Sequence, residues 1–220
     1  LKSDVKDITV LDATGKNIKE LLGIENLVNL KRLNLEKNSI SNIEPLKKLT
    51  SLEEVCLDNN DIKDINALEN ITNIESLSLS GNRIEDISHL KNLKNIDKLN
   101  LDKNEITDIS PLGEMQYLKY INLSSNKISN IDKLNNLENL NSLYLENNSI
   151  TNFGGIKGIY GKIKNKDFKL EDEKKVPKAK EVVVQKEYIV QPQWQVPTYV
   201  VQSDYIFSFS DSRLISDSEI

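Results

Sequence analysis

The chain has 220 residues, 38% of them hydrophobic, and a formal net charge of −5 at pH 7. Its last sixty residues carry 10 basic and 10 acidic side chains, so the negative excess lies within residues 1–160. An acidic body is a poor partner for nucleic acid or an anionic membrane, and no apolar run is long enough to span a bilayer. A single cysteine, Cys56, excludes an internal disulfide framework.

The first predicted element is an imperfect repeat that starts near residue 8 with Leu11-x-Ala13 and has Lys16 where later copies have asparagine. Six copies of a phrase typified by Leu-x-Leu-x-x-Asn-x-Ile follow. Their asparagines recur every 22 residues, at Asn38, Asn60, Asn82, Asn104, Asn126 and Asn148. This period and pattern predict an α/β solenoid of the leucine-rich-repeat horseshoe type. We expect seven repeats within residues 1–160, with a parallel sheet on the concave side and 3₁₀ turns on the convex side.

Each repeat is expected to hold one short strand and one short 3₁₀ segment. The two aliphatic positions of the phrase alternate with exposed ones, as in a strand with one buried face. After the asparagine, aliphatic residues recur every three positions, and an α-helical stripe of that period drifts by about 60° at each step, whereas 3₁₀ geometry keeps it inward. Pro45 and Pro111 are expected in the first turn, and four polar residues are expected as N-caps: Asn66, Ser88, Ser110 and Asp132.

The repeated asparagine is interpreted as structural. Its amide can both donate to and accept from backbone groups of its own loop and the next repeat. Stacked copies then form a buried ladder that satisfies the polar backbone where the strand bends. Lys16 in the first copy fits a repeat at the open end of the stack, where water can replace the amide.

Residues 161–220 differ from the repeats in composition and predict a C-terminal cap or linker followed by a β-rich tail. Glycines break the repeat rhythm near residue 160, and Phe168 is expected to cover the core of the last repeat. The β-like runs are 181–190, 198–202 and 205–209. We expect them to cap the solenoid or to pair with another chain; an extended tail is the alternative.

The concave face is the predicted binding surface, because solenoids present such faces to their partners. Exposed positions flank the buried residues of each strand and recur every 22 residues in three columns. The third column, which contains Glu36, is acidic at four of its seven places, and this favours a basic partner or a cation. The residues predicted to bind a protein partner are Arg32, Glu36, Asp58, Lys98, Asp102, Tyr120, Tyr144 and Glu146.

No catalytic or metal-binding pattern stands out in the sequence. His89 is the only histidine and occupies a slot that holds proline in two other repeats. It is expected on a different face from Cys56, which excludes a Cys–His pair. No second histidine or cysteine completes a zinc site, and a carboxylate pair such as Glu36 and Asp58 holds calcium only weakly. We therefore predict a protein that is not an enzyme and needs no cofactor or metal.

Two phrases carry a family resemblance: Ile18-Lys-Glu-Leu-Leu-Gly-Ile24 and Ile106-Thr-Asp-Ile-Ser-Pro-Leu112. Together with the repeat length, they resemble the internalin-type repeats of Gram-positive bacterial surface proteins. The resemblance implies a non-catalytic recognition module of an adhesin-like protein, at the cell surface or secreted. Two alternatives stay open: an assembly protein that self-associates through the β-rich tail, and a cytoplasmic regulatory scaffold with phosphatase-regulator repeats.

Overall fold

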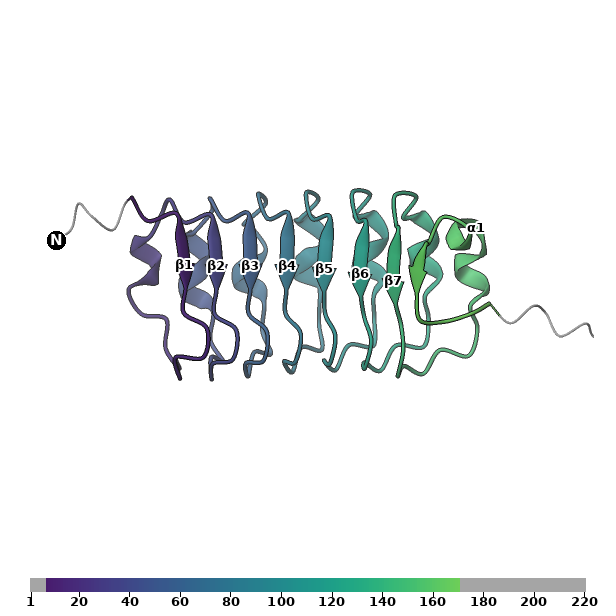
Figure 1. The fold of residues 1–220 in the computed structure, drawn as a ribbon, viewed down its shortest axis with the longest axis horizontal. Coiled ribbons are helices and arrows are strands. Elements are labelled where there is room, and N and C mark those ends of the chain that lie inside the picture. The colour runs from purple at the N-terminus through teal and green to yellow at the C-terminus, as the bar shows by residue number, and fades with distance from the viewer. Residues whose placement is uncertain (1–6, 171–220) are drawn as a thin grey trace, which may run out of the picture. The chain divides into compact units, whose positions relative to one another are not determined.

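The computed structural model describes residues 7–170, which form a stack of repeats joined by one parallel sheet (Figure 1). The sheet order follows the chain order, so each strand pairs with the strand of the repeat before it and the repeat after it. The first seven strands contain three residues each, and the last contains two. Their bounds are β1 Val10–Asp12, β2 Arg32–Asn34, β3 Glu54–Cys56, β4 Ser76–Ser78, β5 Lys98–Asn100, β6 Tyr120–Asn122, β7 Ser142–Tyr144 and β8 Asn165–Lys166.

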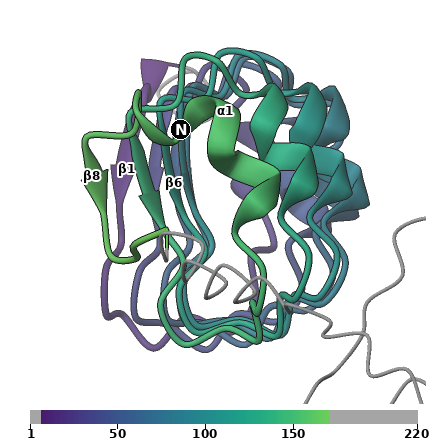
Figure 2. The ribbon, with the colours of Figure 1, turned by 90° about the vertical axis from the view of Figure 1, so that its right-hand side faces the viewer.

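The opposite side of the stack consists of 3₁₀ segments and one short α-helix, as the period of three predicts (Figure 2). Pro45 and Pro111 lie in the first turn of their segments, where a missing N–H does no harm. The segments are η2 Ile24–Asn26, η3 Glu44–Lys48, η4 Asn66–Leu68, η5 Ser88–Asn92, η6 Ser110–Glu114, η7 Asp132–Asn136, η8 Gly154–Ile156 and the helix α1 Lys157–Tyr160.

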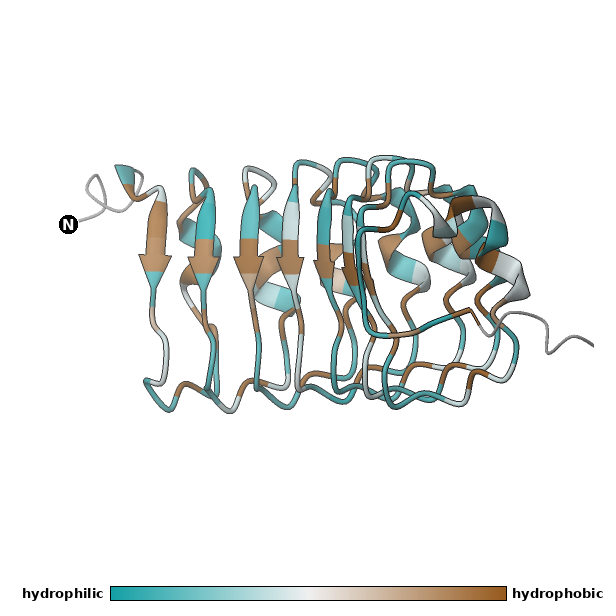
Figure 3. Ribbon diagram, turned by 45° about the vertical axis from the view of Figure 1, so that its right-hand side comes forward, coloured by the Kyte–Doolittle hydropathy of each residue, from teal (hydrophilic) through white to brown (hydrophobic). Residues whose placement is uncertain are grey.

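The core is a single hydrophobic column between the sheet and the 3₁₀ side. The central residue of each three-residue strand points into it, and Figure 3 shows the hydrophobic colour at these strand centres, in most strands with a more polar residue at one or both ends. Leu33 and Leu99 are 2% and 0% exposed. The register pairs Leu33 with Val55 and Leu77 with Leu99, so a shift of 22 residues superimposes one layer of the core on the next.

The prediction of Asn66, Ser88, Ser110 and Asp132 as N-caps is wrong, because the capping side chain lies two residues earlier in each case. Ser88 and Ser110 lie inside the first turn of their 3₁₀ segments, and neither segment has a side-chain cap at its N-cap residue. The cap comes from an Asp or Asn two positions earlier, whose side-chain oxygen accepts a hydrogen bond from the backbone N–H. Asp86 accepts from Ser88 N at 2.8 Å, and the same turn recurs at Asn42, Asp64, Asp108, Asn130 and Asn152.

The asparagine ladder is present, and it links each repeat to the preceding repeat rather than to the next one. Asn104 Nδ2 donates to the carbonyl oxygens of Leu79, Leu101 and Asp102 at 2.9, 3.1 and 3.2 Å. Its Oδ1 accepts from the backbone N–H of Ile84 at 3.0 Å. In the first described repeat the ladder position holds Lys16, whose backbone N–H donates to Asn38 Oδ1 at 3.0 Å. The four inner asparagines are buried, whereas Asn38 and Asn148 at the ends are half-buried.

A second set of hydrogen bonds closes the C-terminal end of the sheet. The carboxylate of Asp167 accepts bonds from the backbone N–H groups of Leu145, at 2.9 Å, and Glu146, at 2.9 Å. Phe168 covers the last repeat, as predicted: its ring stacks on that of Phe153 with centroids 5.1 Å apart. The expected β-like runs at 181–210 lie outside the described residues.

Candidate functional site

The predicted binding residues lie along the outer surface of the sheet, which we call the sheet face. It consists of the outward-pointing residues of β1 to β7 and the column that follows the strands. The register aligns Lys98 with Tyr120, and Asn122 with Tyr144, so neighbouring columns run across the strands as the sequence predicts. Arg32, Lys98 and Glu146 are exposed, and the remaining predicted residues are partly covered.

The N-terminal part of the sheet face is largely occupied by contacts within the chain. Arg32 Nε lies 3.2 Å from Glu54 Oε1, and Lys37 Nζ lies 2.8 Å from Glu36 Oε1. Both pairs are between neighbouring residues of the surface and are solvent-exposed or nearly so, so each adds little stability. They do, however, compensate the charges of Arg32 and Glu36 before any partner arrives.

The centre of the sheet face is a network of short polar side chains. Asp58 Oδ1 accepts bonds from Ser78 Oγ at 2.6 Å and from Ser80 N at 2.7 Å. Ser78 Oγ also accepts from Asn100 Nδ2 at 3.0 Å. These bonds fix the carboxylate of Asp58 in place, and they make Ser78 a hydrogen-bond partner of both Asp58 and Asn100.

The C-terminal part brings together two aromatic rings. Tyr120 on β6 and Tyr144 on β7 contact each other diagonally across the sheet, with ring centroids 5.7 Å apart and planes tilted by 50°. We call them the tyrosine pair. Ser142, which stands directly opposite Tyr120 in the register, is small and only 8% exposed. The tyrosine pair is therefore the largest apolar feature among the predicted binding residues.

Charged groups border the tyrosine pair on both sides. Asp102 Oδ2 accepts from Ser80 Oγ at 3.3 Å and lies 3.3 Å from Lys103 Nζ, so this carboxylate is partly compensated. Glu146 is exposed and makes no ion pair within residues 7–170. Lys98 lies beside Tyr120 on β5. The pKa of the Tyr120 hydroxyl is raised by burial, then by the neighbouring Tyr144 and by the charge of Asp102.

Cys56 also lies on the sheet face. It is half-buried, and its thiol is free. Burial is the main cause that raises the pKa of its thiol to about 11, and the charges of Asp58 and Glu36 add to it. The thiolate is the nucleophile in cysteine chemistry, so a thiol in this environment is poorly reactive near neutral pH.

This predicts slow alkylation of Cys56 in the folded protein. Relative to a thiol with the ordinary pKa of 9.0, a pKa of about 11 lowers the thiolate fraction at pH 8 about 100-fold. The rate with iodoacetamide, followed by mass spectrometry, is expected to fall by about that factor compared with the protein in urea. Equal rates in the two conditions would contradict the burial of the Cys56 thiol and its raised pKa.

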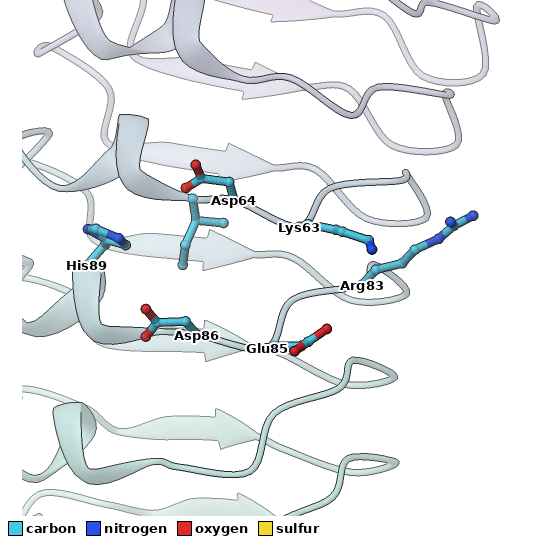
Figure 4. A pocket seen from close by; sticks show the side chains of 7 residues that line it. Lys63, Asp64, Arg83, Glu85, Asp86 and His89 are labelled. Carbon is cyan, nitrogen blue, oxygen red and sulfur yellow. The ribbon is translucent and has the colours of Figure 1, made fainter.

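His89 lies on the 3₁₀ side, away from Cys56, as predicted. It is the second residue of η5, the position that proline takes in η3 and η6, and its Nδ1 is 3.5 Å from Glu69 Oε2. A surface pocket at this place is lined by Lys63, Asp64, Ile65, Arg83, Glu85, Asp86 and His89 (Figure 4).

Several groups of this pocket already have structural partners. Arg83 forms an ion pair with Asp61, whose Oδ1 lies 2.7 Å from its Nη2, and Asp86 holds the turn at Ser88. Hydrogen bonds from Ser88 lower the pKa of the Asp86 carboxyl. No predicted binding residue lines the pocket, so it is separate from the sheet face.

Within residues 7–170, no group of three or more His, Cys, Asp or Glu side chains is arranged to hold a metal ion. Among the helices of this part of the chain, none has the length and apolar character needed to cross a bilayer.

Sequence reasoning found the columns of the sheet face but missed two features of the site. Neither the contact between Tyr120 and Tyr144 nor the role of Asp167 was predicted. Tyr120 and Tyr144 belong to different columns, so the period does not pair them. They are diagonal neighbours on adjacent strands, a distance that aromatic side chains can span, and only this offset signals the contact. Asp167 belongs to a segment without repeat phrasing, so nothing in the period marks it.

Comparison with known proteins agrees with this architecture. The family described as leucine rich repeats (2 copies) matches residues 28–70, 72–114 and 118–158, more than half of the chain. No curated protein is significantly similar in sequence.

Several solved structures are similar to this chain. Internalin C2 of Listeria monocytogenes is 26% identical, with a TM-score of 0.61 over 72% of this chain and 80% of its own. Internalin F of the same species is 22% identical, with a TM-score of 0.43 over 76% and 89% of the two chains. A leucine-rich-repeat protein of Leptospira interrogans is 24% identical, with a TM-score of 0.58 over 76% of this chain and 51% of its own. The chain therefore belongs to the leucine-rich-repeat family, and its repeats are internalin-like.

Proposed function

We propose that the protein is a non-catalytic recognition module that binds a protein partner through the C-terminal part of the sheet face. The observation that carries this proposal is the tyrosine pair, a contact of two large rings on a surface otherwise made mainly of polar and charged side chains. Tyrosine is enriched among the residues that dominate binding energy in protein interfaces. The family supports the coarser statement, because its members present such faces to their partners.

We further propose that the protein acts at the surface of a bacterium or is secreted from it. The similarity to internalin C2 supports this placement. In that setting an adhesin-like role fits a module that recognises other proteins. Fractionation of the source cells with an antibody to the repeats tests it, and a signal confined to the cytoplasm would move the function to the regulatory scaffold.

The binding proposal predicts a contrast between the two sides of the solenoid. A partner captured with the full chain is identified, purified and titrated against Tyr120→Ala, Tyr144→Ala and the convex-side control Lys47→Ala. Loss of either ring is expected to weaken binding by roughly 2 kcal/mol, about 30-fold, because anchor residues of an interface lose this much on truncation. Lys47 is exposed in η3, where its ammonium pairs with Glu44, and its replacement is expected to leave the affinity unchanged.

Two results decide the proposal. Greater damage from Lys47→Ala than from the tyrosine variants would place the partner on the convex side. Equal affinities for all variants would place it away from both surfaces. Thermal unfolding of each variant is the control for folding, and Tyr120→Phe and Tyr144→Phe, which keep the rings, are expected to retain most of the affinity.

A further inference from the structure

The tyrosine pair differs from a purely apolar anchor in its electrostatic surroundings. Aromatic faces carry negative charge density and attract cations that approach within about 6 Å of the ring centre. The rings of Tyr120 and Tyr144 are tilted by 50° rather than stacked flat, so their faces are not fully consumed by each other. Both residues are only partly buried.

Carboxylates lie at the edges of the pair. Glu146 follows Tyr144 by two residues, so it points to the same side of the sheet, and it is exposed without an ion pair in the described part of the chain. On the other side lies Asp102. Burial and Tyr144 are the larger causes that raise the pKa of the Tyr120 hydroxyl, and the charge of Asp102 adds to them, while no cation is among the causes of the shift. Asp102 therefore contributes a carboxylate on the Tyr120 side of the pair.

Arginine is the side chain that matches both parts of this surface. Its planar guanidinium stacks on aromatic rings and at the same time donates paired hydrogen bonds to a carboxylate. Lysine offers a point charge with a tightly held hydration shell, which stacks less well. Asp102 already accepts from Ser80 and pairs with Lys103, whereas the carboxylate of Glu146 has no side-chain hydrogen bond or ion pair within residues 7–170.

We propose that the tyrosine pair together with Glu146 is a binding site for an arginine side chain presented by the protein partner. This inference rests on the proposed function and names the chemistry of the partner at one point of the interface. Lys98 lies next to Tyr120 and opposes a second cation, so the site accepts a single arginine rather than a dense basic stretch.

The probe is a blocked pentapeptide with one central arginine, and the control ligand is the same peptide with citrulline. Citrulline keeps the shape of arginine and removes its charge. Both are titrated into the full chain while the ring signals of the seven tyrosines are followed by NMR. The arginine peptide is expected to shift the signals of Tyr120 and Tyr144 saturably, with an affinity at least about five times that of the citrulline peptide.

Variants then test each part of the site. Tyr120→Ala and Glu146→Gln are each expected to weaken the arginine peptide about fivefold or more, and Tyr120→Phe is expected to keep its affinity because the ring face remains. Glu85→Gln is the matched control, since it removes an exposed carboxylate outside the sheet face. Lys98→Gln is expected to strengthen binding about twofold, because one repelling charge is lost.

Three results would overturn the inference. They are equal affinities for the arginine and citrulline peptides, shifts confined to other tyrosines, and a loss in Glu85→Gln as large as in Glu146→Gln, which would indicate general attraction to an acidic protein. The proposed function fails separately. If the tyrosine variants fail to bind a purified partner and the wild type does not bind the arginine peptide, the proposed recognition surface is supported and the proposed arginine site is refuted.

Discussion

Replacement of Asn104 by alanine is expected to lower the free energy of unfolding by about 3 kcal/mol. The side chain makes four hydrogen bonds to backbone groups, three as donor through Nδ2 and one as acceptor through Oδ1, and it is 7% exposed. Alanine leaves the buried N–H of Ile84 without a partner, at a cost of roughly 1–3 kcal/mol. The carbonyl oxygens of Leu79, Leu101 and Asp102 each lose one hydrogen bond as well but keep another, from Asn82 Nδ2, Asn126 Nδ2 and Gly81 N. Partial relaxation of the backbone around Asn104 limits the total loss of stability. Denaturation in urea, monitored by circular dichroism, measures the change.

Asn95 provides the matched control for this change. Its side chain makes one exposed hydrogen bond, from Nδ2 to the carbonyl oxygen of Thr72 at 2.9 Å. Asn95→Ala is therefore expected to lower the stability by less than about 0.5 kcal/mol. Replacement of Lys16, which occupies the ladder position of the first repeat, is expected to have a similarly small effect. A melting temperature for Asn104→Ala equal to that of the wild type would refute the structural role of the ladder.

Replacement of Gly155 by alanine is the second substitution with a large expected effect. A Cβ at this position lies 2.7 Å from the Cα of Asp132 and closer still to its carboxylate, so the backbone of η7 or η8 has to move. Overpacking of this kind typically costs about 1–3 kcal/mol. We expect a loss near the upper end, because the obstacle is backbone rather than the tip of a flexible side chain. The same urea titration measures it.

Gly161 is the control for the glycine change itself. It ends α1 with a right-handed φ of −66°, and nothing lies within 4 Å of an added Cβ. Gly161→Ala is expected to be neutral or to stabilise the protein by up to about 0.5 kcal/mol, because alanine restricts the unfolded chain. If Gly155→Ala were as stable as Gly161→Ala, the close approach between the last two repeats would be absent in solution.

The two substitutions affect different interfaces between repeats, and both lower the stability of the stack. Each repeat contacts only its neighbours, so stability is close to a sum of interface terms along the stack. Asn104 lies at an inner interface between repeats, and Gly155 lies at the interface between η7 and η8. A damaged inner interface separates two groups of repeats, whereas a damaged terminal interface frays the end next to the tyrosine pair on β6 and β7.

The sequence by itself determined the repeat, its strand and the rows of the sheet face. A period of 22 residues repeats one local conformation, so positions such as Arg32 and Glu54 must become neighbours, and the register confirms it. Leu99 and its counterparts had to be buried because the strand alternates. The asparagine ladder followed from the same reasoning, since a bend that recurs in every repeat needs the same hydrogen bonds each time.

Only the tertiary structure decided the features that break the repetition or depend on side-chain direction. The contact of Tyr120 with Tyr144 depends on how two rings lean across adjacent strands, which a list of columns does not contain. The position of Gly155 holds larger residues in earlier repeats, and glycine is required there only because the last two 3₁₀ segments approach more closely. Asp167 lies outside the repeat phrases and accepts hydrogen bonds from the backbone of the last of them. Local period fixes what is repeated, and packing at the ends and between side chains fixes the rest.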